Sequence, residues 1–417
     1  MEGFTYRGGT LHAEEVSAVE LAERYGTPLY VYSRGYLRHQ FRRIREAFAE
    51  IDPLICFAVK ANTSAAVIHT FAAEGAGADV VSGGELYRAR RAGIPANRIV
   101  FAGVGKTAEE IEYAIQEEIL GFTVESEAEL HRISECATRI GGTARVDIRV
   151  NPDVDPKTHK YTSTGKKENK FGVDLERAVK AYELAARLPG VEIVGLHMHI
   201  GSPVMSIDPY VEALERVAPV VRELKAAYPT LRHLDIGGGL GIRYRDEQED
   251  LDPARLAEAL LPTLRDLGLK VLLEPGRFLT GNAGILLTRV QYLKEGPEKT
   301  FVIMDAAMND LIRPALYEAY HKILPVRETS DTLTGDLVGP VCESGDFFAQ
   351  NRELPAVQAG ELLAVMSAGA YGYVMASNYN SRGRPAEVMV SGGTAKLVQR
   401  RETWDNLVAG ETIPAWE

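Results

Sequence analysis

The chain has 417 residues, 45% of them hydrophobic and 25% charged, and its formal net charge at pH 7 is −11. This length predicts two domains, and the negative charge argues against a nucleic-acid partner, because phosphate binding needs a basic surface. No apolar run is long enough to cross a bilayer, so we expect no membrane partner, and three cysteines without a CxxC pair favour a reducing cytoplasm.

Apolar runs and amphipathic segments alternate along residues 54–273. The apolar runs are typical of strands and lie at 54–59, 77–81, 98–102, 121–124, 144–150, 192–200, 231–236 and 270–273. The segments between them have helical spacing and lie at 64–74, 84–92, 107–117, 126–138, 174–187, 208–228 and 253–267. Strict alternation predicts a parallel sheet, and about eight such units in roughly 250 residues favour a closed (β/α)8 barrel of the TIM type.

Two segments break this alternation. Residues 154–172 are polar and rich in lysine, so we interpret them as a long loop after the fifth strand. After residue 281 the strand-like runs are joined by turns, at 285–293, 300–304, 331–341, 361–368 and 387–390. Short strand-like pieces at 4–6 and 29–32 can complete this second domain. We therefore expect an α/β barrel at 33–281 and a mostly β domain formed by 1–32 and 282–417.

Polar and glycine residues follow nearly all of the predicted barrel strands, at the edge where such barrels place their active sites. Lys60 ends the first run, and a lysine in such a ring is a candidate for covalent chemistry on a carbonyl compound. The other members of the ring are Asp79, Ser82, Gly103, Glu125, Arg149, His197, His199, Gly237, Gly238, Gly239, Glu274 and Arg277. This ring is too polar to be a structural face alone.

The glycine run at 237–239 follows the seventh predicted strand, where barrels often hold phosphate. Successive glycines let backbone N–H groups turn toward an anion, although a glycine run more often marks only a tight turn. Arg277 follows the eighth strand and adds a bidentate donor for phosphate or carboxylate. Together these features favour a phosphate site.

His197 and His199 are two residues apart, so we expect both imidazoles on one face of a strand. An H-x-H pair binds zinc in some barrel hydrolases, but two ligands alone make a poor zinc site, and we expect no metal. A histidine stacked on a flat cofactor, with Ser202 reaching a phosphate, fits the surroundings better. Glu274 either pairs with a neighbouring arginine or keeps a pyridine nitrogen protonated, which maintains an electron sink.

Cys342 precedes Glu343 directly and Asp346 by four positions. Acidic neighbours disfavour a thiolate, so Cys342 is a poor nucleophile and a plausible proton donor. The alternative is a small buried residue at the end of a strand.

As a set, these residues resemble the diaminopimelate decarboxylases, within the alanine-racemase-like (fold type III) pyridoxal-phosphate enzymes. The nine matching segments are F-A-V-K-A-N (57–62), D-V-V-S-G-G-E-L (79–86), N-K-F-G (169–172), G-L-H-M-H-I-G-S (195–202), D-I-G-G-G-L-G (235–241), E-P-G-R (274–277), M-N-D-L-I-R-P-A-L-Y (308–317), C-E-S-G-D (342–346) and G-A-Y-G (369–372). They span nearly the whole chain in the family's order. Pro203 departs from the family pattern, in which a glutamine commonly follows the serine.

The resemblance implies decarboxylation of an amino acid, meso-2,6-diaminopimelate, to L-lysine and CO2 with pyridoxal 5'-phosphate as cofactor. It implies that Lys60 holds the cofactor as a Schiff base, that His199 stacks on its ring, and that Cys342 or Lys60 returns a proton. The residues assigned to the cofactor are Lys60, Asp79, Arg149, His199, Ser202, Gly237, Gly238, Gly239, Glu274, Pro275, Gly276, Arg277 and Tyr371. Those assigned to the substrate are Arg277, Arg313, Tyr317, Glu343 and Tyr371. Cys342 and Glu343 would come from a partner subunit, which implies a homodimer with shared active sites.

Rival functions differ in what they require of these residues. A racemase of this fold uses arginine rather than glutamate at the ring nitrogen. Ornithine and arginine decarboxylases act on substrates with no second carboxylate, whereas Arg277 and Arg313 suit a diaminodicarboxylic acid. A carboxynorspermidine decarboxylase would bind a longer substrate with one carboxylate. A regulatory pyridoxal-phosphate barrel would lack the second β domain, and a metal-dependent barrel hydrolase would need further ligands.

Overall fold

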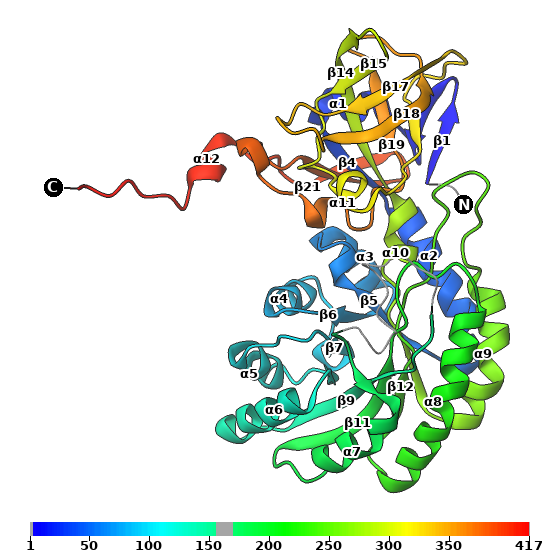
Figure 1. Cartoon of the computed structure of the whole chain (residues 1–417), viewed down its shortest axis with the longest axis vertical. Helices are drawn as coiled ribbons and strands as arrows, with labels where there is room; N and C mark the ends of the chain where they lie inside the picture. The colour runs from blue at the N-terminus through cyan, green and yellow to red at the C-terminus, as the bar shows by residue number, and fades with distance from the viewer. Residues whose placement is uncertain (1–2, 156–169, 417) are drawn as a thin grey trace. The chain divides into compact units, whose positions relative to one another are not determined.

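The structure of the protein is a computed structural model, which describes residues 3–155 and 170–416 (Figure 1). It divides into two compact units. The barrel unit consists of Arg38–Ile242 and Glu249–Leu279, and the β unit consists of Met1–Leu37, Arg243–Gln248 and Thr280–Glu417. Residues 243–248, expected in the barrel, thus belong to the β unit. Most of the loop predicted at 154–172 lies outside the described residues.

Eight parallel strands in the described part of the barrel unit close into a ring. In ring order they are β5 (Leu54–Ala58), β6 (Gly77–Val80), β7 (Ile99–Phe101), β8 (Gly121–Val124), β9 (Ala144–Asn151), β11 (Val191–Met198), β12 (His233–Asp235) and β13 (Lys270–Leu273). The helices between them are α3 (Ala65–Ala73), α4 (Gly83–Arg91), α5 (Ala108–Gln116), α6 (Glu127–Ile140), α7 (Leu175–Ala185), α8 (Asp208–Ala227) and α9 (Pro253–Leu267). The predicted barrel is confirmed.

The sequence dictates both the strands and the helix starts of this barrel. All five residues of β5 are buried, as are all four of β6, because parallel barrel strands are covered on both faces and therefore read as continuous apolar runs. Ser82, Thr107 and Ser126 each cap the following helix by accepting from a backbone N–H three residues on. Each such cap stabilises its helix by about 1 kcal/mol.

A buried histidine and a buried aspartate contact each other in the barrel unit. His233 Nε2 and Asp147 Oδ1 are 2.7 Å apart, and both side chains are almost fully buried. A Cβ at Gly195 would collide with both of them, so glycine in β11 makes room for this pair. We did not predict this contact from the sequence.

The β unit is built around the long strand β14 (Gly284–Glu295). Its main sheet runs in the order β18 (Phe347–Pro355), β17 (Thr332–Val338), β15 (Thr300–Met304), β14, β4 (Leu29–Ser33), β20 (Ala386–Ser391) and β21 (Thr394–Gln399). Strand β19 (Leu362–Val365) pairs with β14 and with β16 (Ile323–Pro325), and β1 (Phe4–Arg7), β2 (Thr10–Ala13) and β3 (Val16–Ser17) form a small separate sheet. Because β4 lies between β14 and β20, the N-terminal segment completes this sheet, as predicted.

Several elements and boundaries differ from the expectations. The structure adds α1 (Ala18–Tyr25), α2 (Arg34–Ala47), α10 (Arg277–Thr280), α11 (Arg313–Tyr317) and α12 (Trp404–Val408), and the strands β2, β3, β10 (Val173–Asp174), β16, β18 and β21. Strand β11 ends at Met198, so the expectation that His197 and His199 share a strand face is wrong for His199, which lies just past the strand. Strand β17 ends at Val338, so Cys342 lies in a turn instead of at a strand end.

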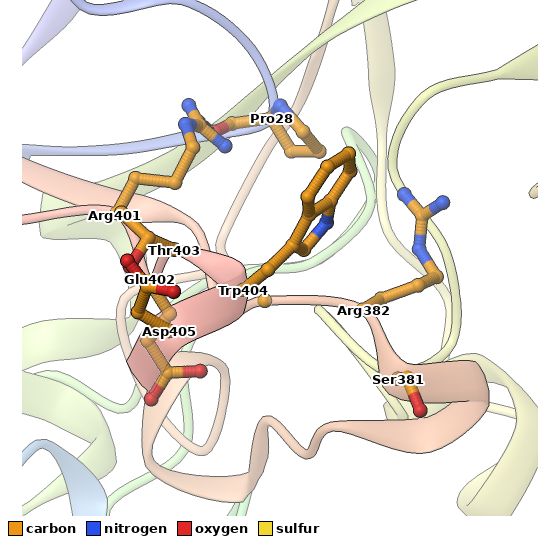
Figure 2. Close-up of a pocket in the computed structure, with 9 residues that line it drawn as sticks. Pro28, Ser381, Arg382, Arg401, Glu402, Thr403, Trp404 and Asp405 are labelled. Atoms are coloured by element: carbon orange, nitrogen blue, oxygen red, sulfur yellow. Dashed lines mark hydrogen bonds between the residues drawn. The ribbon is translucent and has the colours of Figure 1, made fainter. Parts of the chain in front are cut away.

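A cavity of about 550 Å³ opens on the β unit beside Trp404, and arginines form part of its wall (Figure 2). Arg401 Nη2 donates to the carbonyl oxygen of Pro28 at 2.7 Å, and Arg382 Nε donates to Asn309 Oδ1 at 3.1 Å. These arginines therefore tie segments of the β unit together. In the described part of the chain, no helix is both long enough and apolar enough to cross a membrane.

Candidate active site

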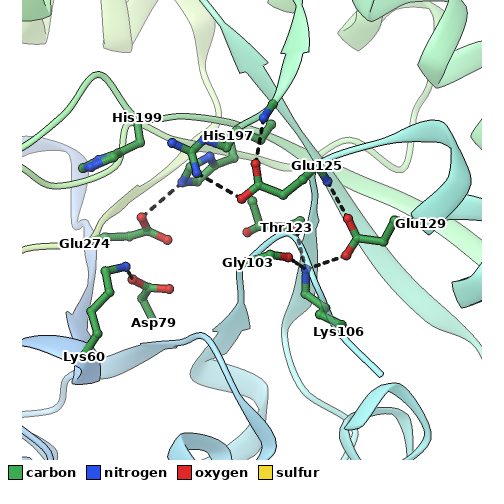
Figure 3. Close-up of polar contacts among 12 residues, drawn as sticks. Lys60, Asp79, Gly103, Lys106, Thr123, Glu125, Glu129, His197, His199 and Glu274 are labelled. Atoms are coloured by element: carbon green, nitrogen blue, oxygen red, sulfur yellow. Dashed lines mark hydrogen bonds and ion pairs between the residues drawn. The ribbon is translucent and has the colours of Figure 1, made fainter. Parts of the chain in front are cut away.

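Lys60 and Asp79 form an ion pair at the carboxyl ends of two neighbouring barrel strands (Figure 3). Lys60 lies in the turn Val59–Ala61 after β5, and its ammonium donates to Asp79 Oδ2 at 2.5 Å. The Asp79 side chain is fully buried, whereas 39% of the Lys60 side chain is exposed. Burial and the charge of Glu274 raise the pKa of Asp79 to about 7, although Lys60 opposes the rise. This pair can hold or move a proton near neutral pH.

Glu274 follows β13 and faces His197 of β11. His197 Nε2 and Glu274 Oε2 are 3.1 Å apart, and both side chains are buried. Burial raises the pKa of Glu274, but His197 and Lys60 lower it more, to about 2. Glu274 thus pairs with a histidine instead of the arginine considered above. Its Oε1 is buried without a hydrogen-bond partner, so one charged oxygen remains for a cationic or N–H group of a ligand.

The same region contains three side chains that could approach a metal ion. His197, Asp235 and Glu274 each place one ligand atom within 4.8 Å of the others, and no second such group occurs among the described residues. Burial and the charge of Glu274 raise the pKa of Asp235 well above its usual value.

His199 lies beside the glycine run. Its Nδ1 accepts from the backbone N–H of Gly238 at 3.2 Å. Burial lowers the pKa of His199 well below its usual value, and the nearby positive charges of Arg149 and Lys60 add to this effect. The imidazole is therefore neutral, and a neutral flat ring suits stacking on a planar ligand.

The glycine run is required by close packing at the strand ends. A Cβ at Gly237 would lie 2.6 Å from the carbonyl oxygen of Met198, and a Cβ at Gly238 would collide with the carbonyl oxygen of Glu274. Gly237 also has a φ of +71°, which side chains disfavour. Only glycine therefore lets this loop lie against the ends of β11 and β13.

Ser202 and Arg277 also come together at this end of the barrel. Arg277 Nε donates to Ser202 Oγ at 3.2 Å, and Arg277 is 7% exposed. A hydroxyl and a guanidinium side by side form a suitable site for an anionic group such as phosphate. The carbonyl oxygen of Pro275 accepts from Ala58 N at 3.2 Å, which joins the segment that carries Arg277 to the end of β5.

Arg149 of β9 is held by Glu125, whose Oε1 accepts from Arg149 Nη1 at 3.0 Å. Both side chains are almost fully buried. Arg149 Nη2 is buried without a hydrogen-bond partner, so it is a donor that a ligand oxygen could satisfy. Figure 3 shows Glu125 near His197.

The remaining predicted residues lie in the β unit, in two places. Arg313, at the start of α11, is buried, and its Nη1 lies 3.0 Å from His321 Nε2 while its guanidinium lies 5.1 Å from the centre of the Tyr244 ring. Cys342 and Glu343 lie in an exposed turn, where Cys342 N donates to Asn380 Oδ1 at 2.9 Å.

The structure thus brings most of the predicted residues together in the barrel unit and places the rest in the β unit. At the carboxyl end of the barrel lie Lys60, Asp79, Arg149, His199, Ser202, Gly237, Gly238, Gly239, Glu274, Pro275, Gly276 and Arg277. In the β unit lie Arg313, Tyr317, Cys342, Glu343 and Tyr371. The roles assigned to all of these residues stay predictions.

Sequence reasoning missed three polar residues that support these groups. Lys106 and Glu129 form a buried ion pair behind Glu125, and His321 contacts Arg313. A signal for Lys106 was present, because it follows a predicted barrel strand closely, as Lys60 does. No signal in the sequence joined His321 to Arg313.

Comparison with known proteins identifies the family. The pyridoxal binding domain of the pyridoxal-dependent decarboxylases matches residues 34–281. A diaminopimelate decarboxylase of Aquifex aeolicus is 52% identical over 97% of this chain and 96% of that protein. A diaminopimelate decarboxylase of Pseudomonas fluorescens is 49% identical over 99% of both chains. The crystal structure of diaminopimelate decarboxylase from M. jannaschii in complex with L-lysine has a TM-score of 0.94 and 40% identity, and covers 99% of both chains.

Proposed function

The chain belongs to the pyridoxal-dependent decarboxylases and, within them, to the diaminopimelate decarboxylases, and we propose that it converts meso-2,6-diaminopimelate to L-lysine and CO2. This reaction is the last step of lysine biosynthesis by the diaminopimelate route. One observation carries the proposal. Lys60 lies at the end of a barrel strand, and the ionised carboxylate of Glu274 has one oxygen free of partners in the same ring of strand ends.

The residues of this ring fit pyridoxal 5'-phosphate. The unpartnered Glu274 Oε1 suits a protonated pyridine nitrogen, and the neutral His199 suits the face of the ring. Ser202, Arg277 and the glycine run suit the phosphate. We assign the cofactor to Lys60, Asp79, Arg149, His199, Ser202, Gly237, Gly238, Gly239, Glu274, Pro275, Gly276, Arg277 and Tyr371.

Bound pyridoxal phosphate supplies an electron sink for the electron pair left when CO2 departs. The protein residues set how strong that sink is. Glu274, whose pKa is about 2, stays negatively charged throughout the neutral range and so favours a proton on the ring nitrogen. Asp79 accepts a hydrogen bond from Lys60 and so holds its Nζ at the strand end. In the proposal, Cys342 or Lys60 then delivers a proton to the substrate carbon.

The substrate is proposed to be a diamino acid with two carboxylates. Arg277, Arg313 and Tyr317 would bind its distal carboxylate, with Glu343 on the distal ammonium and Tyr371 nearby. A buried guanidinium such as that of Arg313 supports this role, because a charge-assisted bidentate contact is strongest where water is excluded. Ornithine and arginine have no group that would require such a contact.

The protein is also proposed to be a cytoplasmic homodimer in which each active site receives Cys342 and Glu343 from the partner. The exposure of both side chains on the β unit is compatible with donation to another subunit. All three cysteines are free in the structure, which suits a reducing compartment.

A substrate panel tests the proposed activity. CO2 release should be measured from meso-diaminopimelate, L-ornithine, L-arginine and L-lysine with the cofactor-loaded protein. We expect release from meso-diaminopimelate to exceed the others by orders of magnitude, because each lost charge-assisted contact costs at least about tenfold. Preferential release from ornithine or arginine would contradict the proposal. Borohydride reduction followed by peptide mapping should place the pyridoxyl group on Lys60, and a label on another lysine would contradict that assignment.

A further inference from the structure

The side chain of Lys106 belongs to a buried chain of polar contacts behind the site (Figure 3). Only 1% of its side chain is exposed. Its ammonium donates to the carbonyl oxygens of Gly103 and Thr123, both at 2.8 Å, and to Glu129 Oε1 at 2.6 Å. All three protons of the ammonium are thus used. Burying an ammonium costs several kcal/mol unless it is fully bonded, so an apolar residue would pack here at lower cost.

Glu129 connects Lys106 to the end of β8. Its second oxygen, Oε2, accepts from the backbone N–H of Glu125 at 2.7 Å. Glu129 also lies in the first turn of α6, whose cap Ser126 accepts from Glu129 N. Burial raises the pKa of Glu129, and Lys106 opposes this rise. The pair therefore fixes the position of the Glu125 backbone.

Glu125 in turn holds two groups at once. Its Oε1 accepts from Arg149 Nη1 at 3.0 Å, and its Oε2 accepts from the backbone N–H of Gly172 at 2.8 Å. The Arg149 guanidinium also lies 4.8 Å from the centre of the Phe171 ring. These contacts leave Arg149 Nη2 as a buried donor without a hydrogen-bond partner.

We propose that Lys106 is a positioning residue for the cofactor site, which acts through Glu129 and Glu125 to aim the free Arg149 donor at an anionic oxygen of the bound cofactor. The inference rests on the proposed pyridoxal-phosphate function. Lys106 itself would touch neither cofactor nor substrate, because its three donors are used by Gly103, Thr123 and Glu129.

The test compares Lys106→Met with Lys106→Met/Glu129→Gln. The single variant leaves a buried carboxylate without its cation, whereas the double variant is neutral and Gln can still accept from Glu125 N. Lys225→Met is the control for the loss of a lysine elsewhere in the barrel unit, because Lys225 is exposed and donates to the carbonyl oxygen of Leu267 at the end of α9. The measurements are the dissociation constant of pyridoxal phosphate, the visible absorption maximum of the bound cofactor, and the melting temperature of the cofactor-free proteins.

Lys106→Met is expected to weaken cofactor binding about 10- to 100-fold, the loss typical of one hydrogen bond to a charged group, and to shift the absorption maximum. The double variant is expected to recover most of the affinity, and Lys225→Met to bind as wild type. Lowered melting temperature with unchanged affinity and absorption in Lys106→Met would overturn the proposal. If the single variant does not fold, Lys106→Gln replaces it: affinity about 10-fold lower with a shifted absorption maximum supports the proposal, and wild-type affinity with wild-type absorption overturns it. A wild-type protein that fails to bind pyridoxal phosphate would instead refute the proposed function.

Discussion

Asp79 makes the stability of the cofactor-free protein depend on pH. Burial, with the charge of Glu274, raises its pKa from the ordinary value of 3.8 to about 7, even though Lys60 lies 2.5 Å away. Between these two values the folded state retains a proton that the unfolded state has lost. The folded state therefore binds more protons, and stability must fall as the pH rises from about 4 to about 7.

The size of this effect follows from the pKa shift. Each pH unit in that window lowers the free energy of unfolding by about 1.4 kcal/mol. The range from pH 5 to pH 8 contains about two such units, because the effect ends near the folded pKa of about 7. The free energy of unfolding therefore falls by about 3 kcal/mol over this range. The asparagine in Asp79→Asn cannot ionise, so this variant does not lose stability in this way as the pH rises. We therefore expect the stability of Asp79→Asn relative to wild type to improve by about 3 kcal/mol between pH 5 and pH 8.

Urea unfolding of the cofactor-free proteins, followed by far-UV circular dichroism, measures this difference. Tryptophan fluorescence is unsuitable because the two tryptophans, Trp404 and Trp416, lie in the β unit. Asp52→Asn is the control, because Asp52 also pairs with a barrel lysine, Lys270 at 2.6 Å, but is 95% exposed. Its contact with Lys270 lowers the pKa of Asp52 below 3.8, so its effect should be the same at pH 5 and pH 8.

A relative stability of Asp79→Asn that does not change between pH 5 and pH 8 would refute this reasoning. It would mean that the buried carboxyl is already ionised at pH 5, and that Lys60 outweighs burial. An equal pH-dependent gain in Asp52→Asn would show instead that removing any carboxylate produces the effect.

Three further predictions concern catalysis. Arg313→Ala should retain cofactor absorption but lose tens- to thousands-fold in activity on meso-diaminopimelate, since a charge-assisted contact in a closed site contributes about 2–5 kcal/mol. Near-normal kinetics in this variant would contradict the proposed selectivity. A mixture of Lys60→Ala and Cys342→Ala proteins should regain up to about a quarter of wild-type activity, because about half of the dimers are mixed and each of these has one intact site of two. The test requires that Cys342→Ala alone is strongly impaired. No recovery after confirmed subunit exchange would exclude shared sites. Glu274→Gln should lose about 10²- to 10³-fold in turnover, and turnover near wild type would show that the charge on Glu274 is dispensable.

The barrel was predictable because its strands are buried on both faces. A strand such as β5, with five buried residues, reads as a continuous apolar run. Helix α2 was missed because its segment is strongly basic and only Leu37, Phe41 and Ile44 mark its buried stripe. Strand β18 was missed because its exposed half carries polar residues. The residue pattern therefore predicts a helix or strand reliably only where most of its residues are buried and apolar.

The site was predictable in its strand-end residues but not in their supports. Lys60, Asp79 and Glu274 were found because chain topology alone brings strand ends to one edge. Lys106 lies in a loop and Glu129 in helix α6, 23 positions further on, and the contact of His321 with Arg313 depends on the packing of the β unit. Such contacts follow from side-chain geometry, which neither periodicity nor spacing encodes.

The structure also determines which buried carboxyl of the site stays charged. Asp79, Asp235 and Glu274 repel one another in a region of low polarity, so they cannot all remain ionised. Glu274 contacts His197, and its pKa falls to about 2, whereas the pKa of Asp235 rises well above its usual value. Asp79, which contacts Lys60, lies between these extremes. The negative charge is thus concentrated on Glu274, whose Oε1 has no hydrogen-bond partner, while Asp79 remains able to exchange a proton beside Lys60.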